Sequence, residues 1–314
     1  MPDPITRSAI EATAAKIAPY IRRTPVMDVT LSKVAQPVAL KLELFQHTGS
    51  FKARGAFSTV LGNDIPKAGI AAASGGNHGA AAAYAAYMAG VPAHIFVPAI
   101  ASPAKVAKIK AYGAIIDQDG ATYYDALEKC TRFIAETGAL SVHAYDAEPT
   151  LLGQGTLGRE IQEQLPDIDT LLVAVGGGGL IGGIAGWYRG DVRIVGVEPD
   201  TCNALHASLA KGERVTVTPS GIAADSLGAS FAGELMFPLA QKYIERVALV
   251  MDEEIRMAQR WLWDHARIMT EPGGATAFAA LLSGAYRPHK DERVGVVLCG
   301  SNTDPLTFSK VMIT

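Results

Sequence analysis

Short apolar segments alternate with helix-like segments along most of this chain, and this alternation constrains its fold more than any other feature. The apolar runs carry few polar interruptions, as in TLLVAV at 170–175. Strands that read as continuous apolar runs are buried on both faces, which is typical of parallel sheets covered by helices. The sequence therefore predicts an α/β fold with mostly parallel sheets.

The expected elements follow from apolar spacing and from Gly and Pro boundaries. Strands are expected at 38–44, 69–74, 94–98, 114–117, 139–145, 170–175, 193–199 and 294–300. Helices are expected at 5–21, 52–61, 78–90, 102–113, 124–138, 154–164, 180–188 and 252–266, with Ser50 capping the second of them. Several strand–helix units fall between residues 69 and 147. We expect a small domain at 69–147 inserted in a larger one made of 1–68 and 148–314.

Composition excludes several classes of protein. A net charge of −3 argues against a nucleic-acid surface, and a solvated helix face explains the neighbouring Lys105, Lys108 and Lys110. No segment is suited to cross a membrane. Three widely spaced cysteines and a start without an apolar signal core favour a reducing, cytoplasmic location.

Three turns deserve a chemical reading, because ligands of such sheets bind beyond the carboxyl ends of the strands. The first leads into Lys52, which falls in the first turn of its helix. The helix dipole opposes a cation there and favours the neutral amine that Schiff-base formation needs. The alternative is an exposed surface lysine.

The other two turns are rich in glycine. Gly176 to Gly179 follow a buried strand and precede a helix, so their bare N–H groups can form a phosphate cradle. The run lacks the ending of a nucleotide P-loop, and a tight packing turn is the alternative. In the turn Ser74-Gly75-Gly76-Asn77-His78, N–H groups and the Ser74 hydroxyl can hold a carboxylate; a capped turn is the alternative.

Together these turns resemble a known family, the fold-type II pyridoxal-phosphate (PLP) enzymes, and specifically the threonine/serine dehydratases and serine racemase. Further matching motifs keep the family's order from about residue 5 to 304: Lys41-Leu-Glu43, Gly49-Ser-Phe-Lys52-Ala-Arg54-Gly-Ala56, Gly153-Gln-Gly-Thr156, Glu198-Pro199, Glu271-Pro272-Gly-Gly-Ala275 and Cys299-Gly-Ser-Asn302. The resemblance implies two open twisted sheets flanked by helices, PLP as cofactor and a homodimer. It also implies no feedback regulation by isoleucine through a further domain.

The resemblance assigns roles to matching residues. Lys52 would hold PLP as a Schiff base and later take the Cα proton of the substrate, with Phe51 packed on the ring. Asn77 would bond the ring oxygen, Gly176 to Gly179 with Leu180 would hold the phosphate, and Cys299 would lie beside the pyridine nitrogen. The substrate carboxylate would lie in the turn formed by Ser74, Gly75, Gly76 and His78.

Two departures from the family bear on specificity. Serine racemases carry the sequence Ser-Ser-Gly-Asn-His at this turn, and their second Ser acts as a base on the opposite face of the substrate. This chain resembles them but has Gly75 at that position, so two-base racemisation is expected to be weak. The racemase's divalent-cation site matches Glu198 and the carbonyl of Cys202, but its Asp ligand corresponds to Ala204, which disfavours Mg²⁺ or Ca²⁺. The segment from Ala224 to Ala229 resembles the carbonyl-rich cation loop of serine dehydratases. We expect a monovalent cation such as K⁺ held by Glu198, Cys202, Leu227 and Ala229, or else a Glu198 that bonds nearby backbone.

The leading interpretation is a dehydratase (ammonia-lyase) that converts L-threonine, L-serine or a similar β-hydroxy amino acid to a 2-oxo acid and ammonia. Another hydroxy amino acid such as 3-hydroxyaspartate is an alternative, and serine racemase is a further one. A β-replacement enzyme of cysteine-synthase type would carry a different Asn-rich loop at residues 74–78. A non-catalytic nucleotide-binding α/β protein is the alternative from a different class.

Overall fold

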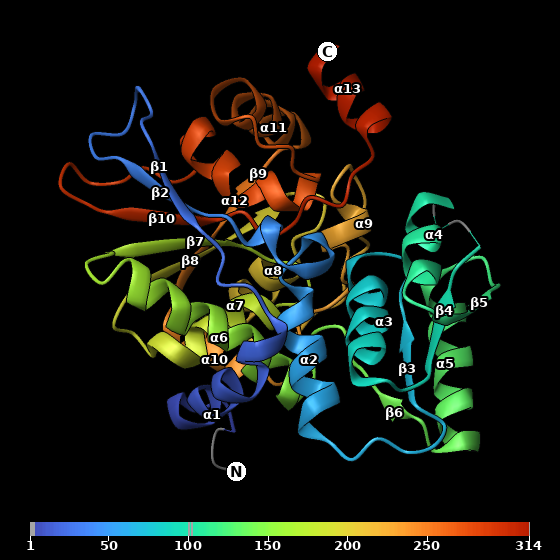
Figure 1. The fold of residues 1–314 in the computed structure, drawn as a ribbon. Helices are drawn as coiled ribbons and strands as arrows, with labels where there is room; N and C mark the ends of the chain where they lie inside the picture. Colours follow the sequence, from blue (N-terminus) through green and yellow to red (C-terminus); the bar gives the residue numbers. More distant parts are fainter. Residues whose placement is uncertain (1–3, 100, 102, 314) are drawn as a thin grey trace.

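The computed structural model describes residues 4–99, 101 and 103–313, which form two sheets flanked by helices (Figure 1). The larger sheet contains β1 (Val26–Val29), β2 (Val38–Lys41), β7 (Thr170–Ala174), β8 (Arg193–Pro199), β9 (Ile244–Val250) and β10 (Val294–Val297). Their order is β1-β2-β10-β7-β8-β9. The pair β1–β2 is antiparallel and the other pairs are parallel. The predicted α/β fold with mostly parallel sheets is confirmed.

The central strands of this sheet are covered on both faces, as their apolar runs predict. Helix α12 (Pro272–Ser283) contacts β7 to β10 on one face, with α11 (Asp252–Ala266) packed outside it. On the other face α7 (Gly179–Tyr188) contacts β7 and packs on α6 (Glu148–Gln164) (Figure 1). The helices α1 (Arg7–Ile17) and α2 (Lys52–Gly62) pack in turn on α6. Burial of both faces therefore accounts for the absence of a polar face in β7.

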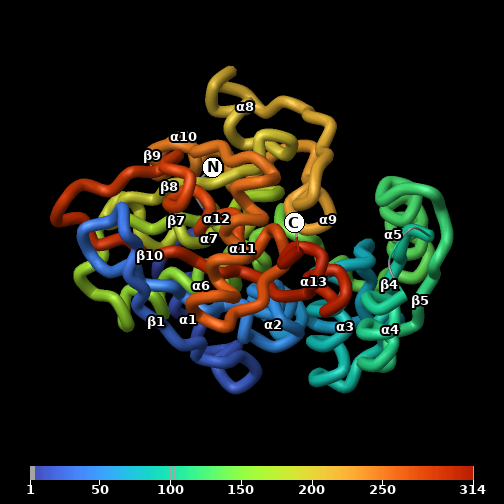
Figure 2. Tube along the Cα trace, turned by 90° about the horizontal axis from the view of Figure 1, so that it is seen from above, coloured from blue at the N-terminus to red at the C-terminus, as the bar shows by residue number. Residues whose placement is uncertain are grey.

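The smaller sheet lies on the other side of the molecule (Figure 2). It contains β3 (Ile70–Ala73), β4 (Ala93–Val97), β5 (Ile115–Gln118) and β6 (Leu140–Ser141), all parallel, in the order β5-β4-β3-β6. Its helices are α3 (Asn77–Ala89), α4 (Pro103–Ala111) and α5 (Tyr123–Thr137). Helix α3 also packs on α2, which joins the two parts. The domain limits at 69 and 147 stay a prediction.

The remaining elements are short or peripheral: the 3₁₀ turns at Ala18–Tyr20, Glu43–Phe45 and His47–Gly49, α8 (Ala204–Lys211), α9 (Ala224–Leu227), α10 (Phe237–Tyr243) and α13 (Pro305–Ile313). Among the described residues, no helix combines the length and apolar character needed to cross a bilayer.

Several expected details were wrong. Ser50 does not cap α2: the cap residue is Phe51, without a side-chain hydrogen bond, and the buried Ser50 hydroxyl finds no partner among the described residues. Instead the Ser50 backbone forms an isolated bridge with Gly300. Strand β2 ends at Lys41 rather than at residue 44, and α6 begins at Glu148, six residues before the expected start.

The lysines of α4 do not form one solvated face. Only Lys110 is exposed. Lys105 forms an ion pair with Asp225 of α9, and the amine of Lys108 donates to the Thr48 carbonyl at 2.8 Å. Two of the three amines therefore face the larger sheet's part of the molecule instead of water.

Candidate active site

Lys52 is the first residue of α2, and its amine contacts the segment that follows β6. The Nζ donates a hydrogen bond of 2.7 Å to the Ala144 carbonyl, and no described carboxylate lies within ion-pair distance of it. Burial lowers the pKa of Lys52 to about 8, although the nearby Cys299 and Glu271 side chains act in the opposite direction. The amine is therefore readily available in its neutral form, which is the form that attacks a carbonyl carbon.

The backbone holds this end of α2 against the last strand of the site. Phe51 N–H donates to the Cys299 carbonyl at 3.1 Å, and Ser301 N–H donates to the Gly49 carbonyl at 2.9 Å. Strand β10 in turn lies between β2 and β7. Two of the predicted site segments, at Lys52 and Cys299, are thus adjacent.

Cys299 is buried and its thiol stays protonated. Burial, with a contribution from Glu271, raises the pKa of Cys299 to about 12. The sulfur lies 3.5 Å from the Gly273 carbonyl, to which it can donate. A neutral thiol of this kind carries no negative charge, so it does not stabilise the protonated form of a neighbouring ring nitrogen.

The turn at residues 176–179 lies close to Lys52 through one short segment. Tyr145 follows Ala144, the hydrogen-bond acceptor of Lys52, and packs on the turn: a Cβ added to Gly177 would lie 2.4 Å from the Tyr145 ring. Gly178 has a φ of +89° and would strain any other residue. The glycines are therefore required by packing, as the alternative interpretation holds.

The same turn also fits a phosphate group. Helix α7 begins at Gly179, and a helix leaves the N–H groups of its first turn without intrahelical acceptors. The dipole of this ten-residue helix favours an anion at that end. Leu180 is the second residue of α7 and is buried. Packing and phosphate binding are thus compatible uses of one glycine run.

The Ser74 to His78 turn enters α3, and its side chains are engaged within the protein. The Ser74 hydroxyl accepts a hydrogen bond of 3.1 Å from Gly76 N–H, which is the capped-turn arrangement. The His78 ring is buried with Nε2 2.7 Å from the Val142 carbonyl. Burial and the charge of Lys52 lower the pKa of His78 to about 3, so the ring is neutral. A carboxylate would meet backbone N–H groups and a hydroxyl in this turn, without a histidine cation.

Asn77, the first residue of α3, forms hydrogen bonds with two residues for which no role was expected. Its amide donates to Glu271 at 2.6 Å and accepts from Asn302 at 2.5 Å. Burial raises the pKa of Glu271, which Asn77 and three lysines lower in part. Glu271 and Asn302 belong to motifs that mark the resemblance, but the resemblance assigns them no role, and no pattern in the sequence points to Tyr145.

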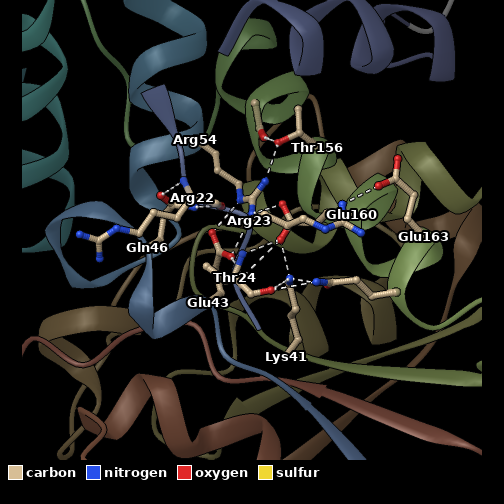
Figure 3. Close-up of polar contacts among 12 residues, drawn as sticks. Arg22, Arg23, Thr24, Lys41, Glu43, Gln46, Arg54, Thr156, Glu160 and Glu163 are labelled. Carbon is tan, nitrogen blue, oxygen red and sulfur yellow. Dashed lines mark hydrogen bonds and ion pairs between the residues drawn. The ribbon is translucent and has the colours of Figure 1, made fainter. Parts of the chain in front are cut away.

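A buried ion network anchors α2 two residues after Lys52 (Figure 3). The guanidinium of Arg54 bonds Glu43 through Nε at 2.6 Å and Glu160 through Nη2 at 2.8 Å. The amine of Lys41 lies 2.5 Å from the other oxygen of Glu160. These two cations and two anions balance, and Arg54 and Lys41 hold the pKa of Glu160 below its usual range although burial opposes this. The network ties α2 to α6 and to the segment after β2.

Two of the predicted cation ligands, Glu198 and Cys202, bond the backbone of the protein itself. The Glu198 carboxylate accepts two backbone N–H bonds, from Leu205 at 2.9 Å and from His206 at 2.8 Å. This is the backbone-bonded alternative, and burial raises the pKa of Glu198 to about 8. Cys202 Sγ lies 3.1 Å from the Ser220 carbonyl. In the described part of the chain, no group of three or more His, Cys, Asp or Glu side chains could bind a metal. A K⁺ site that also uses Leu227 and Ala229 stays a prediction.

The chain is similar to known proteins over most of its length. The model of a family described as "Pyridoxal-phosphate dependent enzyme" matches residues 17–300. A phenylserine dehydratase of Ralstonia pickettii is 38% identical over 312 residues, which cover 96% of this chain and 95% of the relative. An L-threonine ammonia-lyase of Thermotoga maritima is 36% identical over 88% of this chain and 69% of its own length. The solved structure of maize serine racemase superposes with a TM-score of 0.92 at 34% identity, covering 98% of this chain and 97% of that one.

Proposed function

Because the chain belongs to the pyridoxal-phosphate-dependent enzymes of fold type II, we propose that it removes water and then ammonia from a β-hydroxy amino acid, with Lys52 as its catalytic residue. The observation that supports this most is the partly buried amine of Lys52, which bonds the Ala144 carbonyl and is joined through Ala144 and Tyr145 to the glycine turn at the start of α7. An amine and an anion site so placed fit the two ends of one PLP molecule.

Residues of this chain would hold the cofactor from several sides. Lys52 would bind it covalently, the N–H groups of Gly176 to Gly179 would bind its phosphate, and Asn77 would donate to its ring oxygen. When bound, PLP supplies an electron sink for the substrate's Cα. The protonated thiol of Cys299 keeps that sink weak, which favours elimination over transamination.

Proton transfer falls to Lys52. When it is not bonded to the cofactor, the Lys52 amine would be the base that takes the Cα proton of the substrate, and a pKa near 8 suits this exchange at physiological pH. Backbone N–H groups of the Ser74 to His78 turn would bind the substrate carboxylate. The β-hydroxyl leaves as water, and the proton that it gains balances the one that Lys52 takes from Cα. The released enamine becomes an imine, which takes up one water and yields the 2-oxo acid and ammonia.

Aromatic residues beside the site favour a substrate with a large β-substituent as the second candidate. The rings of Tyr145 and Phe231 lie 6.4 Å apart in a T-shaped pair, and Tyr145 touches the glycine turn. Such edges and faces suit a phenyl group. The phenylserine dehydratase relative makes phenylserine the first substrate of this kind to test.

Racemisation is the less favoured alternative. It needs a proton donor on the substrate face opposite Lys52, and position 75 offers no side chain for that purpose. The serine racemase relatives therefore support the fold and the cofactor more than the reaction.

The proposal is tested by a Lys52→Ala variant. It should lose 2-oxo acid release from L-threonine and L-serine, while Lys110→Ala, at an exposed lysine, should retain it. Retained turnover in the Lys52 variant would refute Lys52 as the base. Borohydride reduction should fix the cofactor on Lys52; a colourless protein with Lys52 unmodified would favour the nucleotide-binding alternative.

Substrate choice is tested by comparing kcat/KM for L-threonine, L-serine, phenylserine and 3-hydroxyaspartate. If the aromatic pair contacts the substrate, Phe231→Ala should lower kcat/KM for phenylserine several-fold more than for L-threonine. An equal loss for both would remove the support for an aromatic substrate.

A further inference from the structure

Four polar side chains form one continuous hydrogen-bonded chain from α4 to the buried carboxylate of the site. Lys108 Nζ donates to Asn302 Oδ1 at 2.5 Å, and Asn302 Nδ2 donates to Asn77 Oδ1 at 2.5 Å. Asn77 Nδ2 then donates to Glu271 Oε1 at 2.6 Å. The four residues come from four separate parts of the sequence. We refer to them as the relay.

The direction of every bond in the relay follows from its two ends. A lysine ammonium has donors only, and an ionised carboxylate has acceptors only. Asn302 must therefore turn its oxygen to Lys108 and its NH₂ to Asn77, and Asn77 must turn its NH₂ to Glu271. Lys108 and the Thr48 carbonyl together hold Asn302 in this orientation, and Asn302 and Glu271 together hold Asn77.

The relay also supports the turn in front of Lys52. Thr48 has a φ of +62°, which is uncommon for a residue with a branched side chain. Its carbonyl accepts from Lys108 Nζ and from Asn302 Nδ2, both at 2.8 Å. Two donors on one carbonyl hold the strained residue four positions before Lys52.

We propose that Lys108 is a positioning residue for cofactor binding, acting through Asn302 on the amide of Asn77 and through Thr48 on the Lys52 turn. This inference rests on the proposed function, in which Asn77 donates to the ring oxygen of PLP. One N–H of the Asn77 amide goes to Glu271, and the second has no acceptor among the described residues, so it remains for the ring oxygen. A flipped Asn77 would present its oxygen there and repel the cofactor.

The test compares Lys108→Met with Lys110→Met. Both lysines lie on α4 and carry the same charge, but Lys110 is exposed and takes no part in the relay. Lys108→Met should weaken PLP binding about fivefold to tenfold, less than the full value of its two charge-assisted hydrogen bonds because they act on the cofactor only through Asn302 and Thr48, and should shift the visible absorption band of the bound cofactor. The kcat should fall with little change in KM, because the relay acts on the cofactor. Lys110→Met should match the wild type in all three.

A double-mutant cycle separates the relay from general destabilisation. Asn302→Leu should weaken PLP binding like Lys108→Met, and the loss in the double variant should be smaller than the product of the two single losses, because both variants break the path through Asn302 to Asn77. Lys108→Arg, which keeps a cationic donor, should restore much of the affinity. Melting temperatures of the cofactor-free variants show whether each is folded.

Clear results would overturn the inference. Wild-type PLP affinity and spectrum in Lys108→Met would do so, as would losses that multiply in the double variant. These outcomes differ from failure of the proposed function, in which the wild-type protein itself would neither bind PLP through Lys52 nor release a 2-oxo acid.

Discussion

At the scale of single residues, the amine of Lys52 is a stability cost kept for chemistry. Its pKa is about 8 in the folded protein against 10.5 for an ordinary lysine. Protonation of Lys52 therefore costs more free energy in the folded protein than in the unfolded chain, and this difference is a penalty on stability. The penalty is fully present below pH 8, where both states must carry the charge, and it disappears as the pH rises through 10.5.

This predicts that Lys52→Met stabilises the cofactor-free protein at neutral pH. A lowering from 10.5 to about 8 corresponds to a gain of up to about 3 kcal/mol in the free energy of unfolding. Urea unfolding at pH 7 and pH 10 measures it, and the gain should shrink at the higher pH. A gain that is equal at both values would show that the methionine acts by packing alone.

Position 75 gives the second prediction at this scale. The sequence pattern suggests that Gly75→Ser would raise racemisation, but an added Cβ would lie 2.7 Å from Ala101 Cβ and 2.9 Å from Val97 Cγ1. We therefore expect a loss of about 1–3 kcal/mol of stability from overpacking and no rise in D-serine formation.

Two further variants check this reason. Gly76→Ala, whose Cβ would meet nothing closer than 3.9 Å, should unfold like the wild type. Gly75→Ser combined with Ala101→Gly should regain part of the lost stability. If Gly75→Ser is fully stable and forms D-serine, the packing argument is wrong and the missing hydroxyl alone limits racemisation.

At the scale of elements, α2 is placed by charges as well as by packing. Arg54 is fully buried with Glu43 and Glu160 around it, and Lys41 completes the balance (Figure 3). Breaking a buried ion pair at one partner leaves an uncompensated charge and costs about 3–5 kcal/mol. Arg54→Met should lose that much in chemical denaturation.

The double variant Arg54→Met/Glu43→Gln should lose less than the single variant, because one cation and one anion, Lys41 and Glu160, then remain. The surface pair Arg132–Glu128 is the control, and Arg132→Met should change stability by less than about 0.5 kcal/mol. A double variant as unstable as the sum of its single variants would mean that shape, and not charge balance, holds α2.

The sequence predicts an element well where a local pattern of apolar residues and turns marks it, and poorly where no such pattern exists. The strands β3, β4, β7, β8 and β10 carry local apolar runs with turns beside them, and they were placed correctly. Helix α12 is apolar on all sides and shows no 3.6-residue period, so it was missed. The expected start of α6 is too late because Pro149 suggests a helix boundary, although proline is well tolerated in a first helical turn.

The site divides in the same way. The glycine turns and Lys52 lie in continuous motifs that can be read from one sequence. Lys41 lies in an expected strand with no adjacent residue in the sequence to balance its charge, yet it is buried, because Glu160, 119 residues away, neutralises it. The contact of Lys108 with Asn302 spans 194 residues. Pairings at such separations are set by the tertiary fold and leave no local pattern.

At the scale of the whole molecule, the candidate site lies where the two sheets' parts meet, and exposed polar contacts cross that junction. Tyr124 of α5 donates to Ser230 at 2.8 Å, and Lys105 of α4 pairs with Asp225 of α9. Exposed contacts of this kind are each worth about 0–1 kcal/mol. Because these contacts are weak, we expect the outer edge of the junction to open for substrate and close over it, while the packing of α2 on α3 holds the two parts together.

This predicts that Tyr124→Phe combined with Asp225→Ala favours the open arrangement. KM for the substrate should rise about twofold to fivefold while kcat changes less than twofold, because the contacts act on closure and touch no reacting group. Hydrogen exchange at residues 224–230 should also become faster. Glu213→Ala, which removes the exposed pair Lys211–Glu213 on the larger part alone, is the control and should change neither. An unchanged KM with faster exchange would mean that these contacts order the loop without governing access, and closure would then depend on α2 and α3, whose packing joins the two parts.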